Sequence, residues 1–295
     1  MDEEYPLLEL RIENMDARTV LQDTVNARWK KYAAELKNCR AEFSGEAVHD
    51  LRVAVRRLLA ILDLLRSVIQ HQRIQKTRRE LKDQLDDLDE LRDIQVQLAD
   101  ISEFVHKVPE LKSFRAYLQK REKKSLHITH KRIKSIKLGG LTERITKIRA
   151  MIGSLPEQNL EESLFETLDD AFARVIRDYS EIDVEKPATI HRLRVAFKKF
   201  RYMLEIMHPL LEKFPEGNFQ KMHDYQGMMG DIQDLEVALQ QLDDFVDLDP
   251  AASLESVHSH YTARLKQSMF HYLEDKGELL NFWRTTPDKS FPWEN

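Results

Sequence analysis

The sequence has little cysteine, glycine and proline, and each shortage excludes a class of structure. Cys39 is the only cysteine among 295 residues, so no intrachain disulfide and no cysteine-based zinc site can form. Eight glycines and nine prolines exclude collagen-like chains, low-complexity chains and strand-rich repeats. A single thiol suits a reducing compartment, so we expect a cytoplasmic protein.

Long apolar runs and a targeting segment are also lacking. No stretch approaches the roughly 18 apolar residues that a membrane-spanning helix needs. The chain starts with the acidic segment Met1 to Glu4, which has neither the basic nor the apolar region of a signal peptide. We therefore expect no membrane span.

Helix-forming residues fill most of the chain. Charged residues make up 33% of it, and apolar residues recur at helical spacing almost throughout. This pattern predicts an all-α protein of long antiparallel helices in bundles. The breaks at glycine and proline place helices at 15–43, 46–70, 73–106, 110–137, 141–152, 160–180, 188–212, 218–247 and 252–286.

Two segments of the chain recur at nearly the same offset. Residues 48–58 match 190–200 at an offset of 142, and residues 91–98 match 232–239 at an offset of 141. Two matches at nearly one offset indicate two copies of a four-helix unit. We predict an N-terminal extension at 1–14 and a first unit at 15–138. A linker with a short helix follows at 139–159, then a second unit at 160–286 and a C-terminal tail at 287–295.

The first repeated segment is an amphipathic helix with a basic face. In each copy an apolar stripe lies opposite a histidine, an arginine three residues later, and cations seven and eight residues later. The stripes are Leu51, Val55, Leu58, Leu62, Leu65 and Ile69 in the first copy, and Leu193, Phe197, Phe200, Leu204 and Met207 in the second. The basic positions are His49, Arg52, Arg56 and Arg57, and His191, Arg194, Lys198 and Lys199.

This basic face indicates an anionic ligand rather than a merely solvated surface. Residues 186–201 contain six Lys or Arg and no acid, whereas solvated surfaces normally mix the two signs. Both histidines lie close to predicted helix starts, where unpaired N–H groups favour phosphate-like anions. Arginine adds a planar fork that holds two phosphate oxygens. Presented twice, these groups suit a polyanion.

The net charge of −5 conceals blocks of opposite sign. Residues 48–82 contain nine Lys or Arg and three acids, and residues 112–149 contain thirteen and two. Residues 83–103 contain eight acids and one base, and residues 224–249 contain eight acids and no base. Pairing of acidic helices with basic neighbouring helices would also produce such blocks, so this pairing and an anionic ligand both remain explanations of the charge segregation.

The repeated motifs resemble the CHAD family, the conserved histidine α-helical domain. The motif HxxRxxxRR opens the first half and recurs as HxxRxxxKK in the second, and residues 200–205 (FRYMLE) and 229–237 (MGDIQDLEV) are also similar to that family. The likeness covers about 15–286. It implies two four-helix bundles related by pseudo-twofold symmetry, with a basic central groove that binds inorganic polyphosphate, and an association with polyphosphate granules.

Carried over position by position, the resemblance implies which side chains line the groove. They are His49, Arg52, Arg56, Arg57, His191, Arg194, Lys198 and Lys199. Weaker candidates are Arg78, Arg79, Lys82, Lys221, Lys131, Arg132 and Lys134. Many family members follow a triphosphate-tunnel β-barrel, for which the residues before the first repeat are too few, although the ELRIE stretch at 9–13 is an echo of one. We therefore expect a stand-alone binding module.

The sequence departs from the family pattern at two places. Asp89 stands in the first half where the second half has Gly230, so close helix approach is less certain there. Lys198 and Lys199 replace an arginine pair, which weakens bidentate contacts and keeps the charge. Asp93 and Asp234 belong to the repeat but are acids, and we expect them to buttress basic side chains or cap helices.

Alternative functions remain open at this point. Glu46–His49 and Glu255–His258 have the spacing of di-iron ligands, and His49–Asp50 begins a phosphohydrolase-like motif. The second repeat lacks the matching acids, and the basic face offers no base to activate water, so we expect binding without catalysis, metal or cofactor. Nucleic acid is also a polyphosphate, but few aromatics are available for stacking. A protein-interaction scaffold is the remaining alternative.

Overall fold

Nine α-helices and three short 3-10 helices make up the regular structure of the described residues. The computed structural model describes residues 16–105, 108, 110–248 and 254–294. The α-helices are α1 (Ala17–Ala41), α2 (Gly45–Val68), α3 (Gln72–Phe104), α4 (Leu111–Ser135), α5 (Leu138–Gly153), α6 (Leu160–Ser180), α7 (Ala188–Met207), α8 (Asn218–Leu248) and α9 (Glu255–Asp275). The prediction of an all-α protein is confirmed for these residues.

Local capping explains where the first helices begin. The Asp16 carboxylate accepts a hydrogen bond of 2.9 Å from the Thr19 N–H at the start of α1. The Ser44 hydroxyl accepts one of 3.1 Å from the Ala47 N–H at the start of α2. Each cap satisfies a backbone donor that has no partner within its helix. The start of α7 follows Pro187.

Two predicted helices are too long. The predicted helix 188–212 ends as α7 at Met207, because Pro209 cannot continue the hydrogen-bond ladder and residues His208–Leu210 form a 3-10 turn. The predicted helix 252–286 ends as α9 at Asp275, and Lys276–Asn281 continue as a 3-10 helix containing Gly277. The other predicted bounds lie within a few residues of the observed ones.

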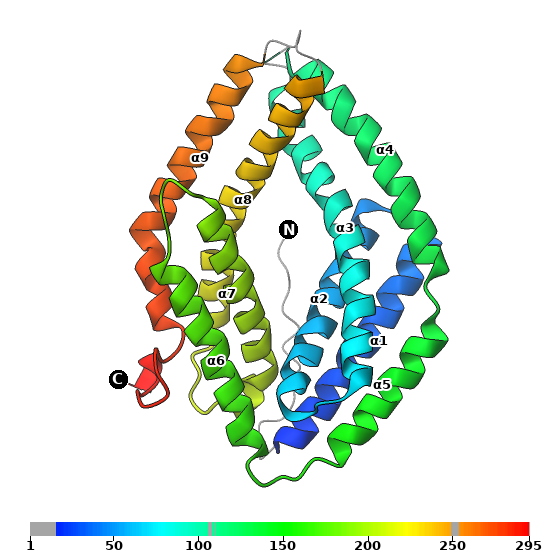
Figure 1. Cartoon of the computed structure of the whole chain (residues 1–295), viewed down its shortest axis with the longest axis vertical. Helices are drawn as coiled ribbons and strands as arrows, with labels where there is room; N and C mark the ends of the chain where they lie inside the picture. Colours follow the sequence, from blue (N-terminus) through cyan, green and yellow to red (C-terminus); the bar gives the residue numbers. More distant parts are fainter. Residues whose placement is uncertain (1–15, 106–107, 109, 249–253, 295) are drawn as a thin grey trace.

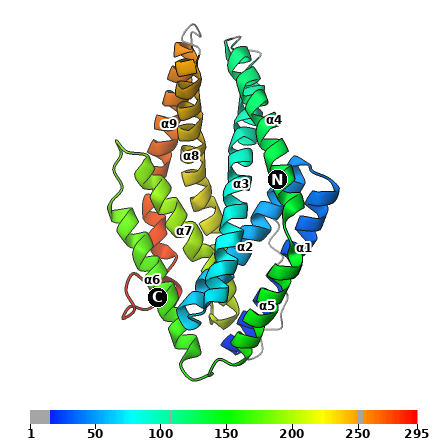
Figure 2. The ribbon, with the colours of Figure 1, turned by 45° about the vertical axis from the view of Figure 1, so that its right-hand side comes forward.

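The molecule has two long helical arms that rise from a broader base (Figure 1). The hairpin of α3 and α4 forms one arm, and the hairpin of α8 and α9 forms the other. The base contains α1, α2, α5, α6 and α7, and Figure 2 shows the same arms from a second side. In the base, α2 contacts both α6 and α7, so the two halves of the chain pack together there.

Two separate apolar clusters hold this arrangement together. The larger one fills the base and includes both predicted stripes: Leu51, Val55, Leu58, Leu62 and Leu65 from α2, and Leu193, Phe197, Phe200, Leu204 and Met207 from α7. Ile69, the last predicted member of the first stripe, is partly buried against this cluster. The smaller cluster joins the arm tips and includes Phe114 of α4 and Phe245 of α8, whose ring centroids lie 5.6 Å apart. The arms therefore meet at both ends.

The short helix between the two halves packs on the first half. Helix α5 contacts α1 and α3, and its Leu141, Ile145, Ile148 and Ile152 are buried in the larger cluster. The division of the chain into two units and their pseudo-twofold relation stay predictions. The predicted extension 1–14 and the ELRIE stretch lie outside the described residues.

No helix in the part of the chain that the structure describes is both long enough and apolar enough to cross a bilayer.

Candidate functional site

The basic faces of α2 and α7 come together at the centre of the molecule. Because the apolar stripes of both helices are buried in the base, their basic residues lie on the opposite side. Helices α2 and α7 contact each other, and the charge of Arg56 on α2 acts on Arg194 and Lys198 on α7. We call Arg52, Arg56, Arg57, Arg194 and Lys198 the central cluster.

In the first half, an acid neutralises the arginines of the central cluster. Asp89 on α3 accepts a hydrogen bond from the Arg52 Nε and another of 2.9 Å from the Arg56 Nη2. The arginine side chains are 14% and 16% exposed and the Asp89 side chain 34% exposed. These two guanidinium groups therefore already share a counter-charge in the folded protein.

In the second half, a glycine stands where Asp89 stands in the first, and the arginine has no such partner. Helix α7 places the Arg194 guanidinium against Gly230 of α8, where a methyl group on Gly230 would lie 3.4 Å from the Arg194 Nη2. The Arg194 Nε is buried and has no hydrogen-bond partner among the described residues. The Arg194 side chain thus lies against Gly230 in the second half, whereas Asp89 pairs with Arg52 and Arg56 in the first. Close approach of the helices at Gly230 stays a prediction.

Lys198 carries the clearest sign of uncompensated positive charge. Burial lowers the pKa of the Lys198 ammonium well below its usual value, and the nearby Arg56, Arg194 and Arg52 lower it further. Its Nζ also lies 5.9 Å from the ring centroid of Tyr202. A buried ammonium among guanidinium groups favours its neutral form unless an anion arrives.

Two arginines that the sequence analysis did not select adjoin the central cluster. Burial and the charge of Arg57 lower the pKa of Arg28 on α1, and burial and the charge of Arg52 lower that of Arg92 on α3. Arg92 could have been selected from the sequence, because it lies inside the repeated segment 91–98. Arg28 could not, because no motif surrounds it. The Arg57 Nε is buried without a partner in the described part of the chain.

The two repeated acids stand among these cations. Burial, together with the charges of Asp89 and Asp234, raises the pKa of Asp93 to about 6, against the opposing effect of Arg52 and Arg56. Burial also raises the pKa of Asp234, although Arg194 favours its charged form. Both acids act on the arginines through their charge, but the acid that hydrogen-bonds Arg52 is Asp89, which the prediction did not choose.

The repeated histidines and Lys199 lie at the edge of this region. His49 is half-buried in the second turn of α2, and His191 is exposed in the first turn of α7. Burial and the charge of Arg194 lower the pKa of His191, so its neutral form is favoured. Lys199 is exposed next to Lys198.

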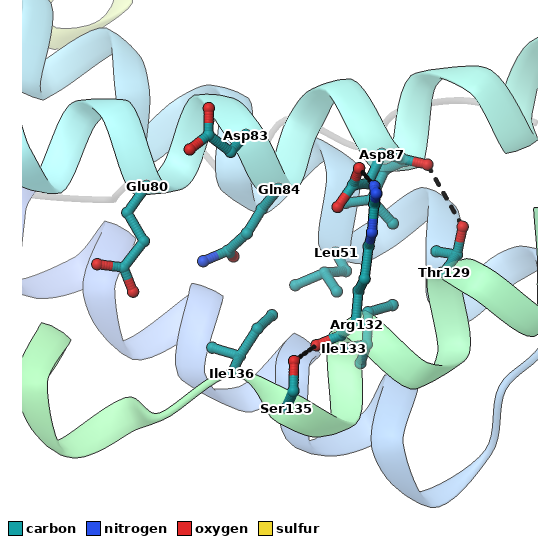
Figure 3. A pocket seen from close by; sticks show the side chains of 11 residues that line it. Leu51, Glu80, Asp83, Gln84, Asp87, Thr129, Arg132, Ile133, Ser135 and Ile136 are labelled. Carbon is teal, nitrogen blue, oxygen red and sulfur yellow. Dashed lines mark hydrogen bonds and ion pairs between the residues drawn. The ribbon is translucent and has the colours of Figure 1, made fainter.

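The weaker candidates are paired with acids or lie elsewhere. Arg78 donates to Asp63, and the Lys82 Nζ lies 2.8 Å from Asp86. Arg132 of α4 pairs with Asp87 across a recess between α3 and α4 (Figure 3). The remaining candidates have exposed side chains on α3, α4 and the start of α8: Arg79, Lys131, Lys134 and Lys221. Helix α4 covers the outer side of α3 (Figure 1), so its basic residues do not join the central cluster.

Within the described ranges, no three His, Cys, Asp or Glu side chains converge in a group that could hold a metal ion. The pairs Glu46–His49 and Glu255–His258 thus lack further ligands of these types there.

Comparisons with known proteins agree with this fold. The model of the CHAD domain family matches residues 23–243, so the chain belongs to that family. It is similar to the crystal structure of the CHAD domain from the plant Ricinus communis, with 18% identity over 90% of both chains and a TM-score of 0.62. It is also similar to PptA from Streptomyces chartreusis, with 16% identity, 89% of this chain and 100% of that chain covered, and a TM-score of 0.65. A search of curated proteins found no match.

Proposed function

We propose that the chain binds inorganic polyphosphate, or a similar phosphate-rich anion, across the central cluster. The observation that carries the proposal is the state of Arg194 and Lys198. Arg194 has a buried Nε without a partner in the described chain, and burial and four arginines lower the pKa of Lys198. Folding has brought these cations together without enough counter-charge, and an anion would supply it.

Membership in the CHAD family supports inorganic polyphosphate as the anion. The resemblance of the two HxxRxxxRR-like segments to the family motif implies this ligand, and the structure brings both segments to adjoining helices. A polymer of phosphates offers many equivalent oxygens to guanidinium forks and an ammonium group.

Nucleic acid fits the central cluster less well than inorganic polyphosphate. Binding single strands usually requires aromatic rings on which bases stack. Phe197 and Phe200 are fully buried in the base, and Tyr202 is 8% exposed. The aromatic residues of α7 therefore belong to the core, which leaves the phosphate backbone as the part of such a ligand that the cluster could contact.

The test is calorimetric titration of polyphosphate into the parent chain and into Arg194→Gln and Lys198→Gln. Each loss of a charged contact is expected to weaken binding by about tenfold or more. Arg132→Gln, which removes a cation of α4 that pairs with Asp87, is the matched control and is expected to bind like the parent. Parent-like affinity in the double variant R194Q/K198Q would overturn the proposal.

We also propose that binding occurs without catalysis. In the described chain, the acids nearest the central cluster, Asp93 and Asp234, act through their charge on its arginines. Polyphosphate incubated with the chain and Mg²⁺ is expected to keep its length on a gel. Steady release of phosphate, abolished in R194Q/K198Q, would contradict this.

A further inference from the structure

A second strongly basic surface lies on α4, away from the central cluster. The sequence of α4 contains nine Lys or Arg and a single acid, Glu122. Six of these cations are lysines with exposed side chains: Lys112, Lys120, Lys123, Lys124, Lys131 and Lys134. We call these six residues the lysine row. The proposed polyphosphate site uses none of them.

The lysine row faces away from the rest of the protein. At about 100° per residue, the six lysines fall within about 120° of the helix circumference. The buried residues of α4, which include Phe114, Leu118 and Ile133, lie on the opposite side, where α4 packs on α3. Helix α4 forms the outer edge of its arm (Figure 1), so the row faces solvent along the whole helix.

The charge of the lysine row is not neutralised within the described part of the chain. None of the six lysines forms a side-chain hydrogen bond or an ion pair with a described residue. By contrast, Arg132 of the same helix pairs with Asp87, and Arg121 lies 5.8 Å from the ring centroid of Tyr117. Like charges three or four residues apart on a helix repel one another. An anionic partner would relieve this repulsion.

The lysines form three groups along the helix axis. The first is Lys112, the second is Lys120, Lys123 and Lys124, and the third is Lys131 and Lys134. At about 1.5 Å per residue, the second group begins about 12 Å from Lys112 and the third ends about 33 Å from it. The row is therefore about as long as one turn of a DNA duplex, which is roughly 34–36 Å.

Three groups over this length match the two strands of a duplex. Because the strands bound a major and a minor groove in each turn, their phosphates cross a line parallel to the axis three times within one turn, counting both ends. A single strand presents no such alternation. Lysine ammonium groups contact phosphates as point charges and read no base.

A membrane surface fits the lysine row less well. Stable attachment to a membrane usually needs an apolar anchor in addition to basic residues. Among its large apolar side chains, α4 exposes only Ile128, at 40%. The row therefore offers charge without an anchor.

We propose that the lysine row binds the phosphate backbone of double-stranded DNA without regard to its sequence. Helix α4 lies along the duplex, its two outer groups contact one strand at points a turn apart, and its middle group contacts the other strand. The proposal is independent of the polyphosphate site, since it uses none of the central cluster.

The test is fluorescence anisotropy of a labelled DNA duplex of mixed sequence, about 20 base pairs long, which is roughly two turns. The parent is expected to bind it with an affinity that falls steeply with salt. The triple variant K112Q/K123Q/K134Q removes one lysine from each group and is expected to bind at least tenfold more weakly. Its slope of log affinity against log salt concentration is expected to be smaller by about 0.9 for each lysine removed.

The matched control is K30Q/K266Q/K289Q, which removes the same charge from exposed lysines of α1, α9 and the C-terminal segment. It is expected to bind the duplex like the parent, and so is the double variant R194Q/K198Q. Circular dichroism of each variant establishes that it is folded.

Four results would overturn the proposal. They are parent-like binding in K112Q/K123Q/K134Q, equal weakening in K30Q/K266Q/K289Q, loss of binding in R194Q/K198Q, and binding of the single strand or of phosphatidylserine vesicles as tight as that of the duplex. Because no polyphosphate is present, failure here leaves the polyphosphate titration to be judged by its own result.

Discussion

At the scale of single residues, the two halves of the chain differ most at Asp89 and Gly230. Asp89 accepts hydrogen bonds from Arg52 and Arg56, whereas Gly230 offers Arg194 only a close surface. The two halves thus differ by one side-chain carboxylate. In the first half it neutralises two arginines, and in the second half, which lacks it, the Arg194 Nε has no partner among the described residues. The difference leaves Arg194 without the hydrogen-bonded carboxylate that Arg52 and Arg56 share.

Exchanging this difference changes polyphosphate affinity in opposite directions. Asp89→Asn removes a counter-charge from two arginines and is expected to tighten binding by roughly fivefold, whereas Gly230→Asp supplies one to Arg194 and is expected to weaken it by a similar factor. Both are measured by calorimetry at one salt concentration. Asp86→Asn, at an exposed acid that pairs with Lys82, is the control. A change of the same sign in both variants would contradict the argument.

Protonation of Asp93 makes the stability of the folded protein depend on pH. Its pKa is raised from 3.8 to about 6, so the folded state favours the protonated form. Its contribution to stability is complete below about pH 4 and is lost as the pH rises through 6. Asp93→Asn is therefore expected to match the parent near pH 4 and to exceed its free energy of unfolding by about 1 kcal/mol at pH 7.

Urea unfolding at the two pH values measures this effect. Asp244→Asn, exposed on α8, is the control. An advantage of Asp93→Asn that is equally large at pH 4 would show that packing, and not protonation, is the cause.

The residues of the site were only partly predictable from the sequence. The repeat selected Arg52, Arg56, Arg194 and Lys198 because helical spacing places them on one face, and the structure brings them together. Arg28 could not be selected, since only the packing of α1 brings it near Arg57. Pairing with acids cannot be read from spacing either, since neither the contact of Arg132 with Asp87 nor that of Arg56 with Asp89 was predicted.

At the scale of elements, most of the fold follows from helical periodicity. The stripes of α2 and α7 are buried as their spacing predicts. The errors lie at helix ends, where Pro209 and Gly277 stop helices inside segments whose apolar pattern continues. Tertiary contacts between distant elements, such as the meeting of the arm tips, leave no periodic signal in the sequence.

The arm tips are expected to behave as a unit separate from the base. Phe245 packs against Phe114 and Tyr117 in the smaller cluster, so Phe245→Ala is expected to destabilise the tips by about 3 kcal/mol. Hydrogen exchange is expected to accelerate in peptides from the start of α4 and the end of α8, and to stay unchanged in α2 and α7. Equal acceleration in α2 and α7 would mean that the two clusters unfold as one.

At the scale of the whole molecule, the net charge of −5 says little about the site. Acidic segments lie along α3 and α8, and the cations of α2 and α7 stand between them. A polyanion therefore meets a local positive potential on a protein of negative total charge. In the proposed function, the attraction of the polyanion is confined to the central cluster and depends on the ionic strength.

Polyphosphate affinity is accordingly expected to fall steeply with salt. Five cations in the central cluster, each releasing counterions from the polymer, give about a hundredfold loss between roughly 50 and 200 mM NaCl. The double variant R194Q/K198Q is expected to show a smaller slope of log affinity against log salt concentration. Equal slopes in parent and variant would place the contacts elsewhere.

The unequal pairing of the arginines in the two halves has a consequence for where a polymer would rest in the proposed function. A chain of identical phosphates carries no sequence, so nothing in the polymer itself fixes its position along the protein. In the proposed function, Asp89 on one side and Gly230 on the other would make the protein supply that position, because Arg194 lacks the hydrogen-bonded carboxylate that Arg52 and Arg56 have among the described residues. Short chains would dwell at that end, and longer ones would slide until their middle lies over it.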